Sequence, residues 1–90
     1  MQKYVIERDI PGAGRMSPAE LNAASKKSRE ALASMGTNVQ WVQSYVTDDK
    51  FYCVYLARNE DEIRRHAKAA GIPATRISPV KAMLDPTNGN

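Results

Sequence analysis

The chain has a single histidine, and its imidazole is the side chain best suited to metal binding or proton transfer near neutral pH. His66 follows Ile63 by three positions in a segment with helical spacing, so it lies on or beside the buried edge of that helix. The alternative is a structural histidine at a helix end, hydrogen-bonded to a neighbouring carbonyl or carboxylate. Because each chain supplies one histidine, a metal site would need carboxylates or water as further ligands.

Two other reactive side chains lie inside predicted strands. Cys53 is in the middle of one strand, where a small buried hydrophobe is the expected role and a Cys–His nucleophile pair is the alternative. Glu7 follows Ile6 in the first strand, and if that strand turns Glu7 inward, its carboxylate needs an arginine or a metal as partner. We therefore take His66 as the primary candidate metal ligand and Glu7 as its companion.

A predicted β-hairpin carries the second candidate site. Residues 41–46 and 51–56 are β-branched and aromatic and flank a polar turn at 47–50. Pairing Val46 with Phe51 predicts one face with Val42, Ser44, Val46, Phe51, Cys53 and Tyr55, and another with Trp41, Gln43, Tyr45, Tyr52, Val54 and Leu56. Both faces are apolar, so we expect helices over one and a second copy of the chain over the other. A pocket between sheet and partner would then be lined by Trp41, Gln43, Tyr45 and Tyr52.

The remaining elements follow from local signals. Residues 4–9 form a first strand, and a capping box at 17–20 starts a helix that ends at Gly36. A second helix begins after Asn59 and ends at Gly71, and residues 75–83 form a last strand that Pro79 confines to a sheet edge. This order predicts an α+β, ferredoxin-like βαββαβ sandwich, with two helices on one face of an antiparallel sheet and dimerisation through the sheet. We expect one domain over residues 1–84 and a polar tail at 85–90.

Composition argues against several classes of partner. The chain has 90 residues, and its 13 basic and 10 acidic side chains are intermixed, with a net charge of +3. A solvated helix face explains the basic cluster at 64–68 without nucleic acid, and strand 50–55 lacks the glycines that let bases approach in RNA-recognition domains. No apolar run reaches the ~18 residues of a membrane span. We expect a cytoplasmic protein without a nucleic-acid or membrane partner.

The chain as a whole also resembles a known family. The resemblance is carried by Tyr-Val-Ile-Glu-Arg at 4–8, by the block 41–50, by His66 and by Gly-Ile-Pro-Ala at 71–74. These residues are similar to a bacterial family of small ferredoxin-like proteins of unknown function that includes a nickel-binding protein. The resemblance implies homodimers and nickel binding or sequestration in place of catalysis, with His66 at the position of a family histidine.

We therefore expect a small homodimeric protein that binds or sequesters nickel or another divalent metal. The alternative is a dimeric α/β-barrel type enzyme or small-molecule-binding protein, with its pocket between sheet and partner. A scaffold protein without a small ligand is the third interpretation. The residues leave open which ligand is bound and whether any reaction is catalysed.

Overall fold

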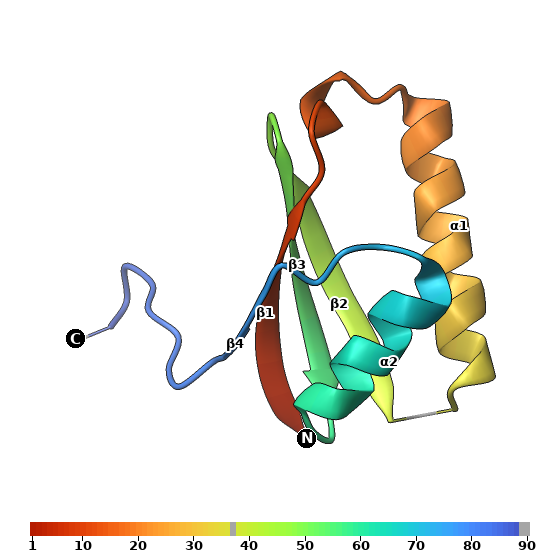
Figure 1. The fold of residues 1–90 in the computed structure, drawn as a ribbon. Helices are drawn as coiled ribbons and strands as arrows, with labels where there is room; N and C mark the ends of the chain where they lie inside the picture. The colour runs from red at the N-terminus through yellow and green to blue at the C-terminus, as the bar shows by residue number, and fades with distance from the viewer. Residues whose placement is uncertain (37, 89–90) are drawn as a thin grey trace.

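The computed structural model describes residues 1–36 and 38–88, and in these residues it contains two α-helices and a four-stranded sheet (Figure 1). The elements in chain order are β1 (Gln2–Asp9), the short 3-10 helix η1 (Ala13–Arg15), α1 (Pro18–Ser34), β2 (Val39–Val46), β3 (Lys50–Ala57), α2 (Glu60–Ala70) and β4 (Arg76–Pro79). Both α-helices lie on the same side of the sheet. The predicted α+β class with an antiparallel sheet is therefore confirmed.

The sheet has the strand order β2-β3-β1-β4, and every neighbouring pair is antiparallel. In the hairpin, Val46 pairs with Phe51 as predicted. The last strand is shorter than predicted, because it ends at Pro79 and not at Met83. Proline lacks the N–H that a continuing ladder requires, and the residues after Val80 are exposed. Of the predicted tail, residues 85–88 are exposed, and residues 89–90 lie outside the described residues.

Local capping signals define both helices. The Ser17 side chain accepts from the Glu20 amide and the Glu20 carboxylate accepts from the Ser17 amide, which completes the predicted capping box. Asn59 caps α2 by accepting from the Glu62 amide, and Gly71 ends it with a φ of 68°. No helix in the described parts of the chain is long and apolar enough to cross a membrane.

One placement in the predicted hairpin is wrong. Trp41 pairs with Tyr55 and Gln43 pairs with Val54, so Val42 is an extra residue in β2 and forms a β-bulge. A bulge shifts the alternation of side chains by one residue. Trp41 therefore lies on the helix side of the sheet, stacked on Tyr55 with ring centroids 6.4 Å apart, and not on the open face with Gln43 and Tyr45.

The core lies between the sheet and the helices. β1 contributes Tyr4 and Ile6, β3 contributes Cys53 and Tyr55, and Ile63 of α2 packs over them. On the opposite face of the sheet, no helix of the described residues is present (Figure 1). The molecule thus has a covered face, which we call the helix side, and an open face.

Candidate functional site

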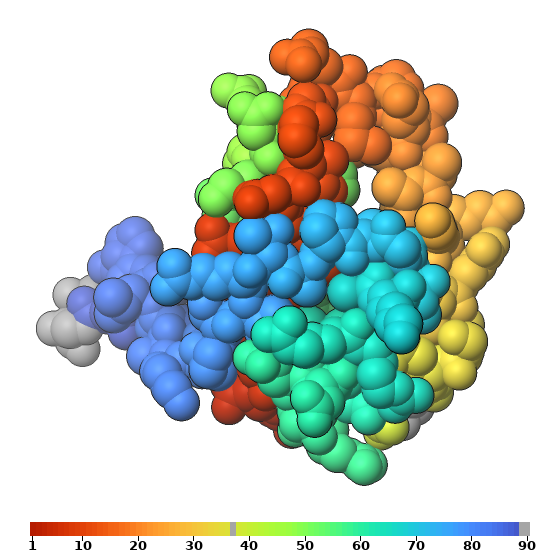
Figure 2. Space-filling model, in the orientation of Figure 1, coloured from red at the N-terminus to blue at the C-terminus, as the bar shows by residue number. Residues whose placement is uncertain are grey.

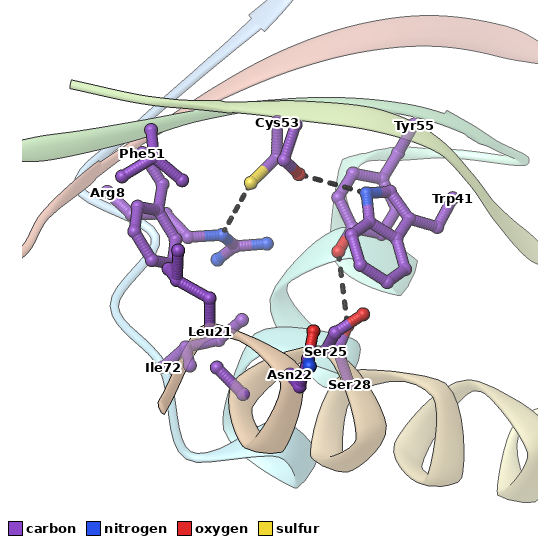
Figure 3. Close-up of a pocket in the computed structure, with 13 residues that line it drawn as sticks. Arg8, Leu21, Asn22, Ser25, Ser28, Trp41, Phe51, Cys53, Tyr55 and Ile72 are labelled. Carbon is purple, nitrogen blue, oxygen red and sulfur yellow. Dashed lines mark hydrogen bonds between the residues drawn. The ribbon is translucent and has the colours of Figure 1, made fainter. Parts of the chain in front are cut away.

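A cavity of about 280 Å³ lies on the helix side, between α1 and the sheet. Its walls are formed by Arg8, Leu21, Asn22, Ala24, Ser25, Ser28, Trp41, Ser44, Val46, Phe51, Cys53, Tyr55 and Ile72 (Figure 3). The residues that α1 turns toward the sheet are mostly small, and short side chains cannot fill the space above the aromatic rings of β2 and β3. In Figure 2 the surface is hollowed between the orange start of α1 and the blue segment that follows α2.

Arg8 is the charged residue in this cavity wall. It alternates with Tyr4 and Ile6 along β1, so strand geometry turns it to the helix side, where none of its surface is exposed. Its Nη1 donates to the Pro73 carbonyl oxygen at 2.7 Å and its Nε donates to Cys53 Sγ at 3.4 Å. The guanidinium carbon lies 5.7 Å from the centroid of the Tyr55 ring. Its Nη2 has no hydrogen-bond partner among the described residues.

A hydrogen-bonded group of three side chains lies beside the cavity. The Ser28 hydroxyl is 3.4 Å from the Tyr55 hydroxyl and 3.2 Å from His66 Nε2, and that nitrogen is also 3.4 Å from the Ser28 carbonyl oxygen. Burial lowers the pKa of His66, assisted by the charge of Arg8 and opposed by the bond to the Ser28 carbonyl. Burial likewise raises the pKa of Tyr55. Both groups are therefore neutral near pH 7, and Tyr55 keeps its hydroxyl proton.

The Ser28–His66 pair lacks the third group of a hydrolytic site. Its hydroxyl is shared with Tyr55, and His66 Nδ1 is buried without a hydrogen-bond partner in the described chain. A nucleophilic serine needs a base that an acceptor at its second nitrogen orients. The group is therefore better suited to joining α1, α2 and β3 than to acyl transfer.

The two predicted metal ligands lie on opposite faces of the sheet. His66 is fully buried on the helix side, whereas Glu7 points to the open face beside Tyr52. Glu7 is paired there with Lys50 at 3.4 Å and with Arg76 at 4.0 Å. The hydrogen bond to Glu7 is the main cause of the raised pKa of Lys50. Within one chain, His66 and Glu7 therefore cannot bind the same ion.

The described residues do not fit a nickel site built from a single chain. They contain no group of three or more His, Cys, Asp or Glu side chains placed to hold a metal ion. His66 has a free Nδ1, but a nickel ion prefers several nitrogen and oxygen donors around it. Glu7, the other candidate, is already neutralised by two cations.

The predicted aromatic pocket is divided between the same two faces. Gln43, Tyr45 and Tyr52 lie on the open face, where the Gln43 amide donates to the Tyr45 hydroxyl. Trp41 lies in the cavity on the helix side and donates from Nε1 to the Ser44 hydroxyl at 2.9 Å. The prediction missed Arg8 and Ser28. The alternation of Tyr4, Ile6 and Arg8 along β1 is the sequence signal that could have predicted the burial of Arg8 on the helix side.

Comparisons with known proteins agree with the predicted resemblance. Residues 4–80 match the family model described as "Nickel responsive protein SCO4226-like". The crystal structure of SCO4226 from Streptomyces coelicolor A3(2) is similar, with a TM-score of 0.75 and 16% sequence identity over 91% of this chain and 99% of that chain. At this identity the structural likeness shows the fold alone. Among curated proteins no sequence matches the chain significantly. The family match covers most of the chain, which therefore belongs to the SCO4226-like family of nickel responsive proteins.

Proposed function

We propose that the protein binds a small organic molecule in the cavity between α1 and the sheet. The observation that carries this proposal is a preformed cavity lined by apolar side chains, by hydroxyl groups and by a buried arginine that has one nitrogen without a partner in the described structure. Binding pockets for small molecules typically measure about 300–1,000 Å³ and combine apolar walls with a few convergent polar groups. At about 280 Å³ this cavity lies just below that range, so the ligand is small. The pocket thus lies within one subunit, on the side opposite to the predicted dimer interface.

We also propose that the chain is a ferredoxin-like subunit of a homodimer. The element order β1-α1-β2-β3-α2-β4 and the strand order β2-β3-β1-β4 support the ferredoxin-like assignment. The open face supports the dimer, because Val54 and Leu56 lie there without a helix and Tyr45 is 56% exposed. Val54→Lys should convert the dimer to a monomer in sedimentation experiments, and Ala33→Lys on exposed α1 surface should not. A monomeric wild type would contradict the dimer.

Fluorescence of the single tryptophan provides the test of the pocket. Trp41 lies in the cavity wall, so a bound molecule should change its emission. Wild-type protein is titrated with a panel of small carboxylates, phenols and amides. Ala24→Leu fills the cavity and should abolish the response, whereas Ala33→Leu on the exposed side of the same helix should leave it intact. The proposal fails if no compound binds, or if Ala24→Leu binds as wild type does.

Nickel is a second candidate ligand, favoured by the family's description. Because Glu7 and His66 lie on opposite faces, a nickel site that uses Glu7 would need ligands from two copies of the chain, and the ion would have to replace Lys50 and Arg76 at the carboxylate. Calorimetric titration with nickel should then show saturable binding that is lost in Glu7→Gln and retained in His66→Ala. Loss of binding in His66→Ala would contradict this placement, and the absence of saturable binding to wild-type protein would exclude nickel as a ligand.

A further inference from the structure

Arg8 is a buried cation whose charge no anion in the described part of the chain balances. None of its surface is exposed, and among residues 1–36 and 38–88 it forms no ion pair with a carboxylate. Its neighbours are neutral acceptors: the Pro73 carbonyl, the Cys53 sulfur and the face of the Tyr55 ring. Buried charges in proteins are normally paired, because removing an ion from water costs several kcal/mol. An anion bound beside the guanidinium would therefore balance its charge.

Arg8 is one of the residues that line the cavity, although none of its surface is exposed in the ligand-free structure. Nε and Nη1 are each bonded to protein, and Nη2 remains without a partner in the described structure. Figure 3 shows the guanidinium between Phe51 on one side and the rings of Trp41 and Tyr55 on the other, facing α1 across the cavity. A planar guanidinium held at two nitrogens is pre-oriented, so an anion binding at the third gains a fixed geometry.

The other walls define the rest of the ligand. Leu21, Phe51, Ile72 and the ring of Trp41 form apolar parts of the cavity wall. This surface suits a hydrocarbon or aromatic body and would not hydrate an inorganic anion. Near the opposite wall, the hydroxyls of Ser28 and Tyr55 can bond to one further polar atom. Because Arg8 is the one cation among the lining residues, we expect the ligand to carry one negative charge.

We infer that the ligand is a small monocarboxylate with an apolar body and that Arg8 binds its carboxylate group. The inference rests on the proposed function, since it names the class of molecule that the cavity takes. It assigns Arg8 as the residue that selects acids over neutral molecules of the same shape. Apolar walls of Leu21, Phe51 and Ile72 select against phosphate and sulfate.

The experiment compares benzoate, its neutral counterpart benzamide, and inorganic phosphate, by Trp41 fluorescence and calorimetry on the full chain. Wild-type protein should bind benzoate saturably and bind benzamide about tenfold to hundredfold more weakly, as expected for loss of a charge-assisted hydrogen-bonded pair. Phosphate should bind more weakly than benzoate. This comparison needs no variant, so it is independent of any effect of mutation on folding.

Three variants then test whether Arg8 causes the preference. Arg8→Met keeps a side chain of similar length without the charge, and should bind benzoate no better than benzamide. Arg64→Met removes an exposed arginine on α2 and should retain the wild-type preference. Circular dichroism shows whether Arg8→Met is folded, and Arg8→Lys, which keeps the charge but loses the planar fork, should weaken benzoate binding while retaining some preference for it.

The outcomes separate the inference from the function on which it rests. Equal binding of benzoate and benzamide, tighter binding of phosphate, or an unchanged preference in Arg8→Met would each overturn the carboxylate assignment. The cavity would then still be a binding site for small molecules, but not one in which Arg8 selects a carboxylate. Failure of every compound in the wider panel would overturn the pocket itself.

Discussion

The two faces of the sheet differ in whether the charges of two adjacent residues of β1, one acidic and one basic, are paired. Glu7 lies on the open face, half-buried, and is paired with Lys50 and Arg76. Arg8, the next residue, lies on the helix side, fully buried, and no carboxylate of the described chain pairs with it. On the open face, basic side chains of the same chain balance the carboxylate of Glu7. On the helix side, the guanidinium of Arg8 has no such partner among the described residues, and an anion bound beside it would balance its charge.

The largest expected difference between the faces is in packing. Ile6 is completely buried on the helix side, whereas Leu56 is half-buried on the open face, and both side chains lose three carbons on change to alanine. Ile6→Ala should reduce the free energy of unfolding by about 2–5 kcal/mol. Leu56→Ala should reduce it by less than half as much. Urea denaturation at protein concentrations low enough for monomers measures both.

An equal loss in the two variants would contradict this difference between the faces. A loss in Leu56→Ala that grows with protein concentration would instead show that a second copy covers Leu56 and support the proposed dimer.

The next effect is a dependence of stability on pH that arises on the helix side. The folded-state pKa of His66 lies below its ordinary value of about 6.5, mainly because of burial. Below about pH 6.5 the unfolded chain therefore binds a proton that the folded chain does not. Stability should fall as the pH is lowered from about 6.5 to the folded pKa, by up to about 1.4 kcal/mol per pH unit.

His66→Gln keeps a polar side chain and removes the titration, so it should flatten this part of the stability curve. The measurement is urea unfolding of both proteins between about pH 7 and pH 5. A slope that persists unchanged in His66→Gln would mean that carboxylates of the chain, and not the buried imidazole, cause it.

The smallest expected effect is the change in the free energy of unfolding when the charge of Arg8 or of Lys50 is removed, and it tests the difference in charge pairing between the two faces. Replacing a buried, unpaired charge by an apolar side chain of similar volume is often neutral or stabilising. Arg8→Met should therefore change the free energy of unfolding of the ligand-free protein by no more than about 1 kcal/mol, with Pro73 and Cys53 losing one hydrogen bond each. On the open face, Lys50→Met should cost about 0–1 kcal/mol, as for other exposed ion pairs.

Chemical denaturation of the two variants checks this prediction. A loss of several kcal/mol in Arg8→Met alone would identify Arg8 as a structural residue and weaken its assignment as a ligand anchor.

Features set by neighbours in the sequence could be predicted, and features set by distant contacts could not. The capping box at Ser17, the glycine at the end of α2 and the pairing of Val46 with Phe51 each depend on a few adjacent residues. The bulge at Val42 depends on how two strands register, and it moved Trp41 to the other face. The cavity depends on the distance at which α1 packs from the sheet, which no local pattern reports. The sequence analysis did not place Arg8 in the core because the residue is charged, although its position in the alternation of β1 indicates the helix side.

The bulge has a consequence for comparing relatives of this protein. One extra residue in β2 determines whether the tryptophan belongs to the cavity or to the open face. A relative that lacks this residue would keep the same side-chain types in the same order, yet its tryptophan would face the other way. Alignments that allow gaps in loops but not in strands would equate the two, and would assign a lining residue of one pocket to the outer surface of another. The length of β2 is therefore as informative about which residues line the cavity as the identity of those residues is.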